Sequence, residues 1–160
     1  MGIEIERKFL LRDNAWRLEG KGIRYLQGYL LRSRERTVRI RIAGSKGYLT
    51  VKGEDQNGVR PEYEYSIPFD DAHRMLEDLC EKPLIDKVRH RIRYRGNMWE
   101  VDEFAGENRG LVLAEVELKS PNTPIAYPPW IGREVTGDTR YINANLVSRP
   151  FTKWPRRPGG

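Results

Sequence analysis

Residues 1–10 read MGIEIERKFL, and the placement of the charges in this stretch decides how the chain folds. Successive side chains of a β-strand point to opposite faces, so the stretch separates into two sets. One set is apolar except for Arg7 and consists of Ile3, Ile5 and Phe9. The other set is charged and consists of Glu4, Glu6 and Lys8. These charges either face solvent, as on an ordinary half-buried strand, or point into an enclosed space.

The same alternation recurs along the chain, in short segments separated by turn-forming residues. Strands are expected over residues 3–11, 22–32, 37–43, 48–53, 60–69, 84–95, 98–104 and 111–119. Counted by the period of two, one face of these strands carries the acids Glu4, Glu6, Glu62, Glu64, Glu100, Asp102, Glu115 and Glu117. The same face carries the bases Lys8, Arg39, Arg41, Lys52, Lys87, Arg89, Arg91 and Arg93. Eight acids against eight bases predict a nearly neutral face.

Two helices are expected beside the strands. Residues 70–82 carry an apolar stripe at helical spacing, with Asp70 or Asp71 as the N-cap. A second helix is expected over residues 137–149, capped by Asp138. Eight strands joined mostly by hairpins predict a mainly β protein of the α+β class. The expected architecture is a closed eight-stranded antiparallel β-barrel, with a few helices packed outside it and at one end.

Composition narrows the class of protein. The chain has 160 residues, of which 38% are hydrophobic and 32% charged, as in a single globular domain. Cys80 is the one cysteine, so no intramolecular disulfide forms, and a reducing, cytoplasmic location is expected. The sequence offers no apolar run long enough to span a membrane and no signal peptide. The net charge of +6 suits a polyanionic partner without selecting one.

Periodicity alone leaves two arrangements of the barrel open. In one, the apolar faces fill a small core and the charges coat the surface; in the other, the charges line a hydrated tunnel. The charged face carries repeated E-x-E and R-x-R doublets instead of scattered polar residues. Like charges two residues apart on one strand face repel each other. Such doublets fit a face that a ligand and metal ions neutralise, but the residues alone do not decide between the two arrangements.

Several motifs resemble those of the CYTH superfamily, the triphosphate tunnel metalloenzymes. EIERKF at residues 4–9 resembles the E-x-E-x-K signature of that family. Further strand motifs match in order and spacing: VRIRI at 38–42, LTVK at 49–52, PEYEYSI at 61–67, DKVRH at 86–90, WEVDEFAG at 99–106 and LAEVEL at 113–118. PPWIGREVTGDTRYINANL at 128–146 resembles the C-terminal segment of the short bacterial members.

The resemblance implies a tunnel with its charged faces inward, and an activity on triphosphates. The short chain and its first residues most resemble the bacterial tripolyphosphatase branch. The implied function is metal-dependent hydrolysis of inorganic triphosphate to pyrophosphate and phosphate. A class IV adenylyl cyclase, a nucleoside triphosphatase or a thiamine triphosphatase of the same fold are the enzymatic alternatives. A non-catalytic barrel that binds polyphosphate or nucleic acid is the alternative of another class. It is disfavoured because the cations share their faces with acids instead of alternating with aromatic rings.

The basic residues are expected to bind the substrate. Arginine donates two parallel hydrogen bonds to phosphate, and lysine acts as a point charge. The candidate substrate-binding residues are Lys8, Arg39, Arg41, Lys52, Lys87 and Arg89. Arg91 and Arg93 are expected near one mouth, as tunnel or rim cations. The implied partner is a small-molecule triphosphate, and neither a membrane nor a nucleic acid is expected to bind. The protein is expected to be a monomer or a homodimer.

The acidic residues are expected to hold Mg²⁺ or Mn²⁺, since bare carboxylates would repel a polyanion. Magnesium is typically held by one or two carboxylates together with phosphate oxygens and water. The candidate metal ligands are Glu4, Glu6, Glu62, Glu64, Asp102, Glu115 and Glu117, with Glu4, Glu6 and Glu117 favoured. The candidate catalytic residues are Glu4, Glu6, Lys8 and Lys87.

Other residues give weaker signals. His73 and His90 are too few and too far apart in sequence for a zinc site, and His90 is expected to face outward. Tyr141 and Asn145, one helical turn apart, are candidates for closing one mouth of the tunnel, and packing alone explains them equally well. Residues 1–150 are expected to form one tunnel domain, and residues 151–160 a flexible basic tail.

Overall fold

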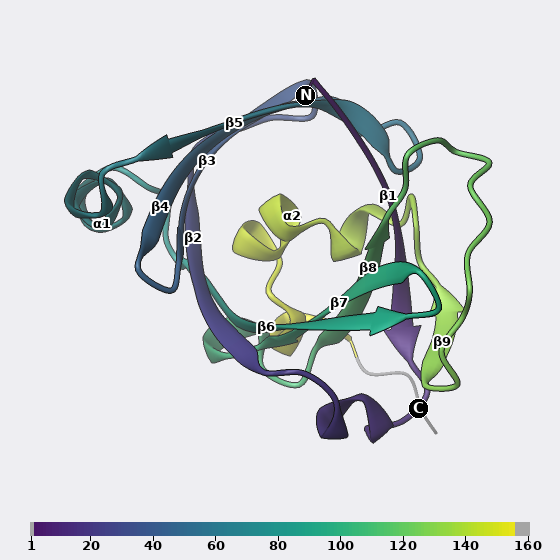
Figure 1. The fold of residues 1–160 in the computed structure, drawn as a ribbon. Coiled ribbons are helices and arrows are strands. Elements are labelled where there is room, and N and C mark those ends of the chain that lie inside the picture. Colours follow the sequence, from purple (N-terminus) through teal and green to yellow (C-terminus); the bar gives the residue numbers. More distant parts are fainter. Residues whose placement is uncertain (1, 156–160) are drawn as a thin grey trace.

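The computed structural model describes residues 2–155 and contains nine β-strands among them. Figure 1 shows the strands as a ring seen along its axis. Their bounds are β1 Ile3–Leu11, β2 Gly22–Arg32, β3 Arg36–Ala43, β4 Lys46–Gly53, β5 Val59–Ile67, β6 Ile85–Tyr94, β7 Asn97–Phe104, β8 Val112–Glu117 and β9 Ile131–Glu134. The first eight lie within two residues of the expected bounds.

Hydrogen bonding closes the sheet into a barrel. The strand order is β5-β4-β3-β2-β6-β7-β8-β1-β9, and an additional pairing joins β5 to β1. Every pairing between these strands is antiparallel. Eight strands therefore form a closed antiparallel β-barrel, as the sequence predicted. The ninth, β9, pairs with part of β1 outside the ring and was not expected, because its four residues follow a proline-rich segment.

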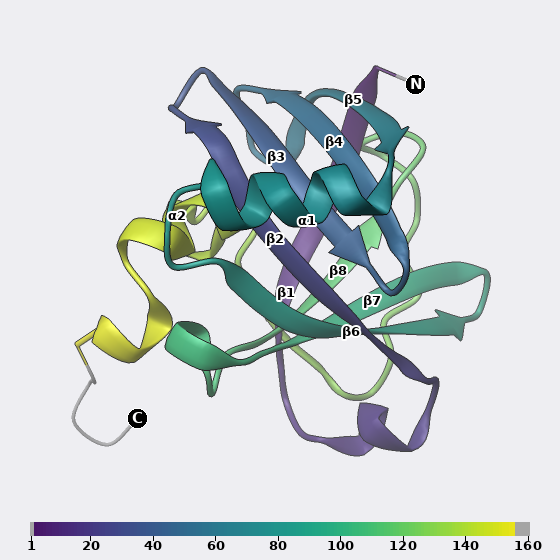
Figure 2. The same cartoon turned by 90° about the vertical axis from the view of Figure 1, so that its left-hand side faces the viewer.

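The alternation of apolar and charged residues places the apolar faces outside the barrel. On β3, Ile40 and Ile42 point outward and are buried under α1, which spans Phe69–Asp78. Figure 2 shows α1 lying across the outer face of β2, β3 and β4. The charged residues of β3, Arg39 and Arg41, line the interior instead. The arrangement with charges inside the barrel is therefore confirmed.

The expected N-cap of α1 was wrong. The helix begins at Phe69 with Pro68 as the N-cap residue, which makes no side-chain capping bond. Asp70 and Asp71 lie in the first turn. Carboxylates there favour the helix because they face the positive end of its dipole. The two acids therefore support the helix N-terminus from its second and third residues instead of from the N-cap position.

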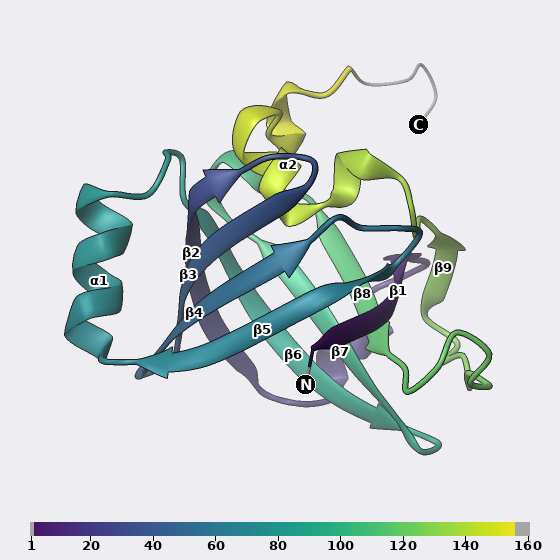
Figure 3. The ribbon, with the colours of Figure 1, turned by 90° about the horizontal axis from the view of Figure 1, so that it is seen from above.

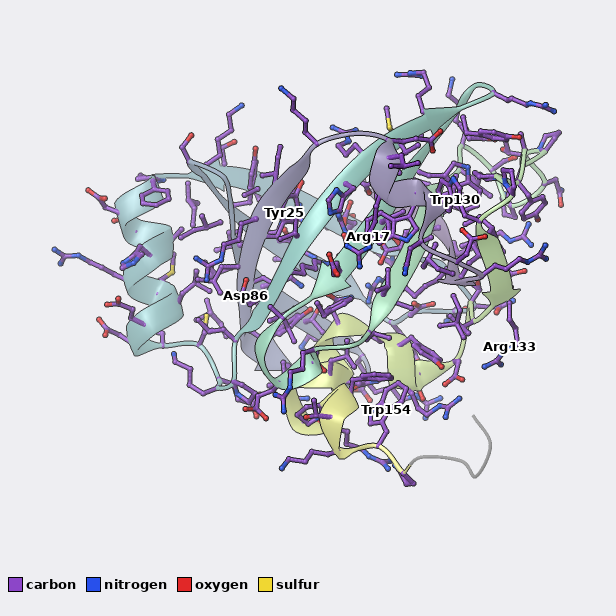
Figure 4. The ribbon with its side chains drawn as sticks, turned by 90° about the horizontal axis from the view of Figure 1, so that it is seen from below. Arg17, Tyr25, Asp86, Trp130, Arg133 and Trp154 are labelled. Atoms are coloured by element: carbon purple, nitrogen blue, oxygen red, sulfur yellow. The ribbon has the colours of Figure 1, made fainter. Side chains whose placement is uncertain are left out.

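A second apolar cluster covers the opposite side of the barrel. It contains Trp99 of β7, Trp130 and Trp16, together with Phe9, Ile92, Val101, Ala114, Val116, Leu118 and Ile131. Trp16 belongs to the short 3₁₀ helix η1, Ala15–Leu18, and is fully buried. Its ring lies 5.0 Å from that of His90, which confirms that His90 faces outward. Figure 4 shows η1 with Arg17 over this side of the barrel, near Trp130.

The C-terminal segment closes one end of the barrel (Figure 3). One helix was expected over residues 137–149, but the structure has the 3₁₀ helix η3, Thr139–Tyr141, followed by α2, Asn143–Ser148. The two are separate because Ile142 has an extended backbone, with φ −71° and ψ 128°. Asp138 therefore caps η3, accepting a hydrogen bond from the Arg140 N–H.

Part of the expected tail is packed against the barrel. Phe151–Lys153 form the 3₁₀ helix η4, and Phe151 and Trp154 pack on the apolar cluster beneath α2. Trp154 meets the Tyr141 ring edge-on, with ring centroids 5.1 Å apart, and lies beside the C-terminal helices in Figure 4. Residues 156–160 lie outside the described part of the chain. None of the helices in residues 2–155 has the length and apolar character needed to cross a membrane.

Candidate active site

The interior of the barrel holds a cavity of about 220 Å³ lined almost entirely by charged side chains. Seven acids line it: Glu4, Glu6, Glu62, Glu64, Glu100, Glu115 and Glu117. Eight bases line it: Lys8, Arg39, Arg41, Lys52, Arg60, Lys87, Arg89 and Arg91. Tyr25, Tyr29 and Asn143 complete the wall. We call this cavity the lumen. The even balance predicted from parity thus becomes an excess of one base.

Two residues placed on the inward face by parity do not line the lumen. Arg93 is exposed near the end of β6. Asp102 is fully buried behind the wall, where Lys87 donates to it at 2.8 Å and Arg89 donates to it at 2.7 and 2.8 Å. These bonds hold the pKa of Asp102 well below its usual range, despite the burial that opposes ionisation. Asp102 therefore fixes two lumen bases in place.

Bases also hold two of the acids that do line the lumen. Glu64 accepts hydrogen bonds from Thr50 at 2.8 Å, Arg41 at 3.2 Å and Arg39 at 3.4 Å. Glu115 lies 3.7 Å from Lys8 and 3.6 Å from Arg89. Although burial alone would raise the pKa of Glu115, these two bases lower it. Both carboxylates are therefore paired within the wall.

A second group of acids faces other acids. Glu6 of β1 lies opposite Glu117 of β8 in the strand register. Burial, together with Glu115 and Glu4, raises the pKa of Glu6 to about 8. Burial and contact with Glu4 raise the pKa of Glu62 to about 7, and burial with nearby acids raises that of Glu117. Ionising all of these carboxylates is unfavourable unless a cation joins them.

Glu4 links this acidic group to the bases. Its carboxylate accepts from Lys52 at 2.9 Å and lies 3.5 Å from Arg60. Burial opposes ionisation, but Lys52, the contact with Glu62 and Arg60 hold the pKa of Glu4 well below its usual range. Glu4 is therefore ionised at neutral pH. Its negative charge is one cause of the raised pKa of Glu6 and of Glu62.

The donor set of Glu4, Glu6, Glu62 and Glu117 fits a divalent cation. The four carboxylates come from β1 and its two barrel neighbours, β5 and β8. Within residues 2–155, however, no three acidic, histidine or cysteine side chains converge as a preformed metal cage. An incomplete set agrees with Mg²⁺, which uses one or two carboxylates and takes its other oxygens from phosphate and water.

The turn between β4 and β5 contacts the backbone of Glu6 and fixes its position. Gly58, at φ +87°, accepts a hydrogen bond from the Glu6 N–H at 2.9 Å. A Cβ atom at position 58 would lie 2.4 Å from the Glu6 carbonyl oxygen, so only glycine permits this approach. Asp55 stabilises the turn by accepting from the Gly58 N–H at 2.7 Å.

The arginines of β3 line the lumen, and each keeps one unpaired hydrogen-bond donor. The buried Nε atoms of Arg39 and Arg41 have no partner among the described residues. Burial and repulsion from Arg39 and Arg89 lower the pKa of Arg41 to about 10. Unpaired buried donors and crowded cations both favour binding of an anion.

Lys8 and Lys87 are the lysines nearest the closed end of the lumen, because both donate to the segment at residues 141–143. Burial and the nearby Arg89 lower the pKa of Lys87 to about 8, although Asp102 opposes that shift. Burial would also lower the pKa of Lys8, but Glu115 and Glu6 raise it.

Sequence reasoning missed four residues of the wall. Arg60 lies two positions before Glu62 on β5, so the period of two was a sufficient signal for it. Tyr25 and Tyr29 share a period-two face of β2, but they carry no charge and so lack the signal that marks the other wall residues. Asn143 gave no signal, because it was expected inside one continuous helix, and the extended backbone of Ile142 instead makes it the first residue of α2. Tyr141 and Asn145 lie in the segment that closes one end of the barrel, but neither lines the lumen: Tyr141 is buried in the apolar cluster, and Asn145 lines a different cavity.

Comparison with known proteins identifies the family. The CYTH domain model matches residues 2–151. An inorganic triphosphatase of Acetivibrio thermocellus is 52% identical over 151 residues, covering 94% of this chain and 97% of that protein. An inorganic triphosphatase of Nitrosomonas europaea is 36% identical, covering 90% and 96%. The crystal structure of the inorganic triphosphatase NE1496 aligns with a TM-score of 0.64 at 34% identity, covering 90% of this chain and 93% of that one. The chain belongs to the CYTH domain family.

Proposed function

We propose that this protein hydrolyses inorganic tripolyphosphate to pyrophosphate and phosphate within the lumen, using Mg²⁺ or Mn²⁺. The observation that carries the proposal is that the lumen wall contains two kinds of unsatisfied groups, one basic and one acidic. Arginines with unpaired donors, Arg39 and Arg41, share the cavity with acids whose ionisation is unfavourable, Glu6 and Glu62. A polyanion with a divalent cation satisfies both sets together.

The bases are proposed to bind the phosphate chain. Lys8, Lys52 and Lys87 supply point charges, and Arg39, Arg41 and Arg89 supply guanidinium forks. Arg60 joins this group because it lines the same cavity beside Glu4. In the transition state, charge spreads over the equatorial oxygens of the attacked phosphorus, and fixed cations stabilise that charge. Hydrolysis forms one bond from water oxygen to phosphorus and breaks one phosphoanhydride bond.

Four acids are proposed to hold the cation: Glu4, Glu6, Glu62 and Glu117. Glu64 and Glu115 remain candidate ligands; like Glu4, they also bond bases of the wall and so orient them. Asp102, which does not reach the lumen, is proposed to position Lys87 and Arg89. When bound, Mg²⁺ or Mn²⁺ would withdraw charge from phosphate oxygens and lower the pKa of water. The acting unit is proposed to be the single domain of residues 1–150, as a monomer or homodimer.

Lumen chemistry favours an inorganic substrate over a nucleotide. A nucleobase needs an apolar or aromatic surface on which to stack. Tyr25 is an aromatic ring in the wall, but the guanidinium carbons of Arg41 and Arg89 already lie 5.0 and 4.9 Å from its centre. The other uncharged lining residues among those described are Tyr29, which is buried, and Asn143.

The test is phosphate release from tripolyphosphate, ATP and thiamine triphosphate, each with Mg²⁺, with Mn²⁺ and with EDTA. We expect the highest kcat/KM with tripolyphosphate, a loss of turnover in EDTA and no cyclic AMP from ATP. A higher kcat/KM with ATP, or formation of cyclic AMP, would replace the proposal with a nucleotide enzyme. Binding of tripolyphosphate without release under any metal would identify a non-catalytic binder.

A further inference from the structure

One short C-terminal segment contacts both lysines near the closed end of the lumen. We call residues 139–148, comprising η3 and α2, the cap. The Lys8 Nζ donates to the carbonyl oxygen of Tyr141 at 3.0 Å. The Lys87 Nζ donates to the side-chain oxygen Oδ1 of Asn143, also at 3.0 Å. The cap therefore supplies hydrogen-bond acceptors to two groups that belong to the site.

The orientation of the Asn143 amide is fixed from two sides. An ammonium group only donates hydrogen bonds, so the amide atom facing Lys87 must be the oxygen. The same oxygen accepts from the Nε2 of Gln27 on β2 at 3.2 Å. Gln27 is fully buried, so its amide is held within the wall of the barrel. Asn143 consequently presents an acceptor to Lys87 in a single orientation.

Two of the three donors of Lys87 are thereby accounted for. Asp102 accepts one N–H at 2.8 Å, and Asn143 accepts a second at 3.0 Å. Lys87 lines the lumen yet is only 2% exposed, so it has little freedom to rotate. Because Asp102 and Asn143 accept two of the three N–H groups of Lys87, the third N–H is available to a ligand in the cavity.

Besides its bonds to the two lysines, the cap is held by apolar packing outside the lumen. Tyr141, Leu146 and Val147 are buried in one cluster with residues of the barrel. Trp154 packs against the Tyr141 ring from outside. Asn143 is the first residue of this packed helix, so the packing of α2 holds its backbone in place. A rigid support of this kind can orient a catalytic side chain.

We propose that Asn143 is a positioning residue that orients the Lys87 ammonium toward the substrate, acting from the cap across the end of the barrel. The inference rests on the proposed tripolyphosphatase function. Displacement of a substrate-contacting group by about 1 Å can cost on the order of 100-fold in rate. We therefore expect Asn143→Ala to lower kcat/KM for tripolyphosphate by roughly 10- to 100-fold.

The test is a double-mutant cycle with a matched control on the same helix. Asn145→Ala removes an amide from α2 that donates to Thr139 O within the cap and does not line the lumen. The wild type, Asn143→Ala, Asn145→Ala, Lys87→Ala and the Asn143→Ala/Lys87→Ala double variant are assayed at equal folded concentration. If Asn143 acts through Lys87, its 10- to 100-fold effect shrinks to about twofold or less without the lysine.

Three results would overturn the inference. The first is a loss in Asn143→Ala no larger than that in Asn145→Ala. The second is a loss of the same factor in both backgrounds, which indicates a structural effect. The third is a loss explained by a lower folded fraction in circular dichroism. If Lys87→Ala has no measurable turnover, the double-mutant cycle uses a second measurement, the rise in Tm on adding tripolyphosphate with Ca²⁺. The same three results in that measurement would overturn the inference.

Absence of turnover in the wild type would instead contradict the proposed function.

Discussion

Glu6 and Glu117 lie directly opposite each other on β1 and β8, and both point into the lumen. Like charges in facing positions of an antiparallel pair destabilise the sheet. Burial and nearby carboxylates raise the pKa of both side chains, so ionising the two together is unfavourable. In Figure 1 these two strands lie side by side on one side of the ring. This unfavourable ionisation is the structural reason to expect a cation at this point.

Removing one of these charges tests the metal assignment. We expect Glu6→Gln, and likewise Glu4→Gln, to lower kcat for tripolyphosphate by at least about tenfold in limiting Mg²⁺. The amide keeps the volume of the side chain and loses its charge, so the fold should persist. Circular dichroism and phosphate release measure the two effects. Glu103→Gln, on the outer surface beside Arg17, is the control. Near-wild-type rates in both lumen variants would refute the assignment.

The stability of the metal-free protein should depend on Glu6 in a defined pH range. Burial and nearby carboxylates raise the pKa of Glu6 to about 8, above its value in an unfolded chain. Its contribution to stability is thus fully present below the unfolded pKa and lost as pH rises through about 8. In EDTA, Tm should fall between about pH 5 and pH 9, and Glu6→Gln should flatten that fall.

Glu81→Gln provides the control for this pH dependence. The hydrogen bond from Arg32 lowers the pKa of Glu81, so its contribution is lost only as pH falls into the acid range. The variant should leave the slope between about pH 5 and pH 9 unchanged. Equal slopes for wild type and Glu6→Gln would show that Glu6 titrates normally.

Calcium should bind without supporting turnover. It takes 6–8 oxygen ligands at longer distances than the octahedral set of Mg²⁺, so it places reacting groups less strictly. We expect Ca²⁺ to raise the Tm of the tripolyphosphate complex and to inhibit hydrolysis in competition with Mg²⁺. Titration of phosphate release with both ions measures the competition. Comparable turnover with either ion would contradict a geometrically demanding site.

Tyr25 should support two of the substrate-binding arginines. Its strand, β2, lies between β3 and β6, which carry Arg41 and Arg89 on its two sides. A cation over an aromatic face gains about 0.5–2 kcal/mol. Tyr25→Leu should therefore lower kcat/KM by roughly 2- to 30-fold, whereas Tyr25→Phe, which keeps the ring, should stay near wild type. Equal losses in both variants would assign the effect to the hydroxyl group.

The barrel and most of its charged wall were predictable because both depend on the period of two. Once the charged faces are placed inward, Glu4, Arg39 and Lys52 follow from strand parity alone, and all three line the lumen. Parity says on which side of a strand a residue lies but not how deep it lies. Asp102 has the correct parity, yet Lys87 and Arg89 hold it behind the wall.

The rest of the site depends on tertiary contacts that carry no local signal. Ile142 interrupts the expected C-terminal helix with an extended backbone, which brings Asn143 to the end of the barrel. Nothing in the residues around position 143 predicts that interruption. The pairing of β9 with β1 likewise follows from the packing of Trp130 and Ile131 on the outer cluster.

Thermal stability tests whether the lumen binds the substrate. Arg39 and Arg41 lie close together in the wall, and a bound polyanion should relieve their repulsion. A ligand at 100 times its Kd stabilises the folded state by about 2.7 kcal/mol. Each kcal/mol raises the Tm of a domain of this size by roughly 2–4 °C. Tripolyphosphate with Ca²⁺ should therefore raise Tm by roughly 5–10 °C.

Paired double variants show where that shift arises. Arg39→Ala with Arg41→Ala removes two lumen cations and should abolish most of the rise in Tm. Arg17→Ala with Arg24→Ala removes two cations from the outer surface, where they pair with Glu103 and Asp86. Net charge changes equally in both, so nonspecific attraction of a polyanion falls equally. If the outer pair loses the shift and the inner pair keeps it, the tripolyphosphate does not bind in the lumen.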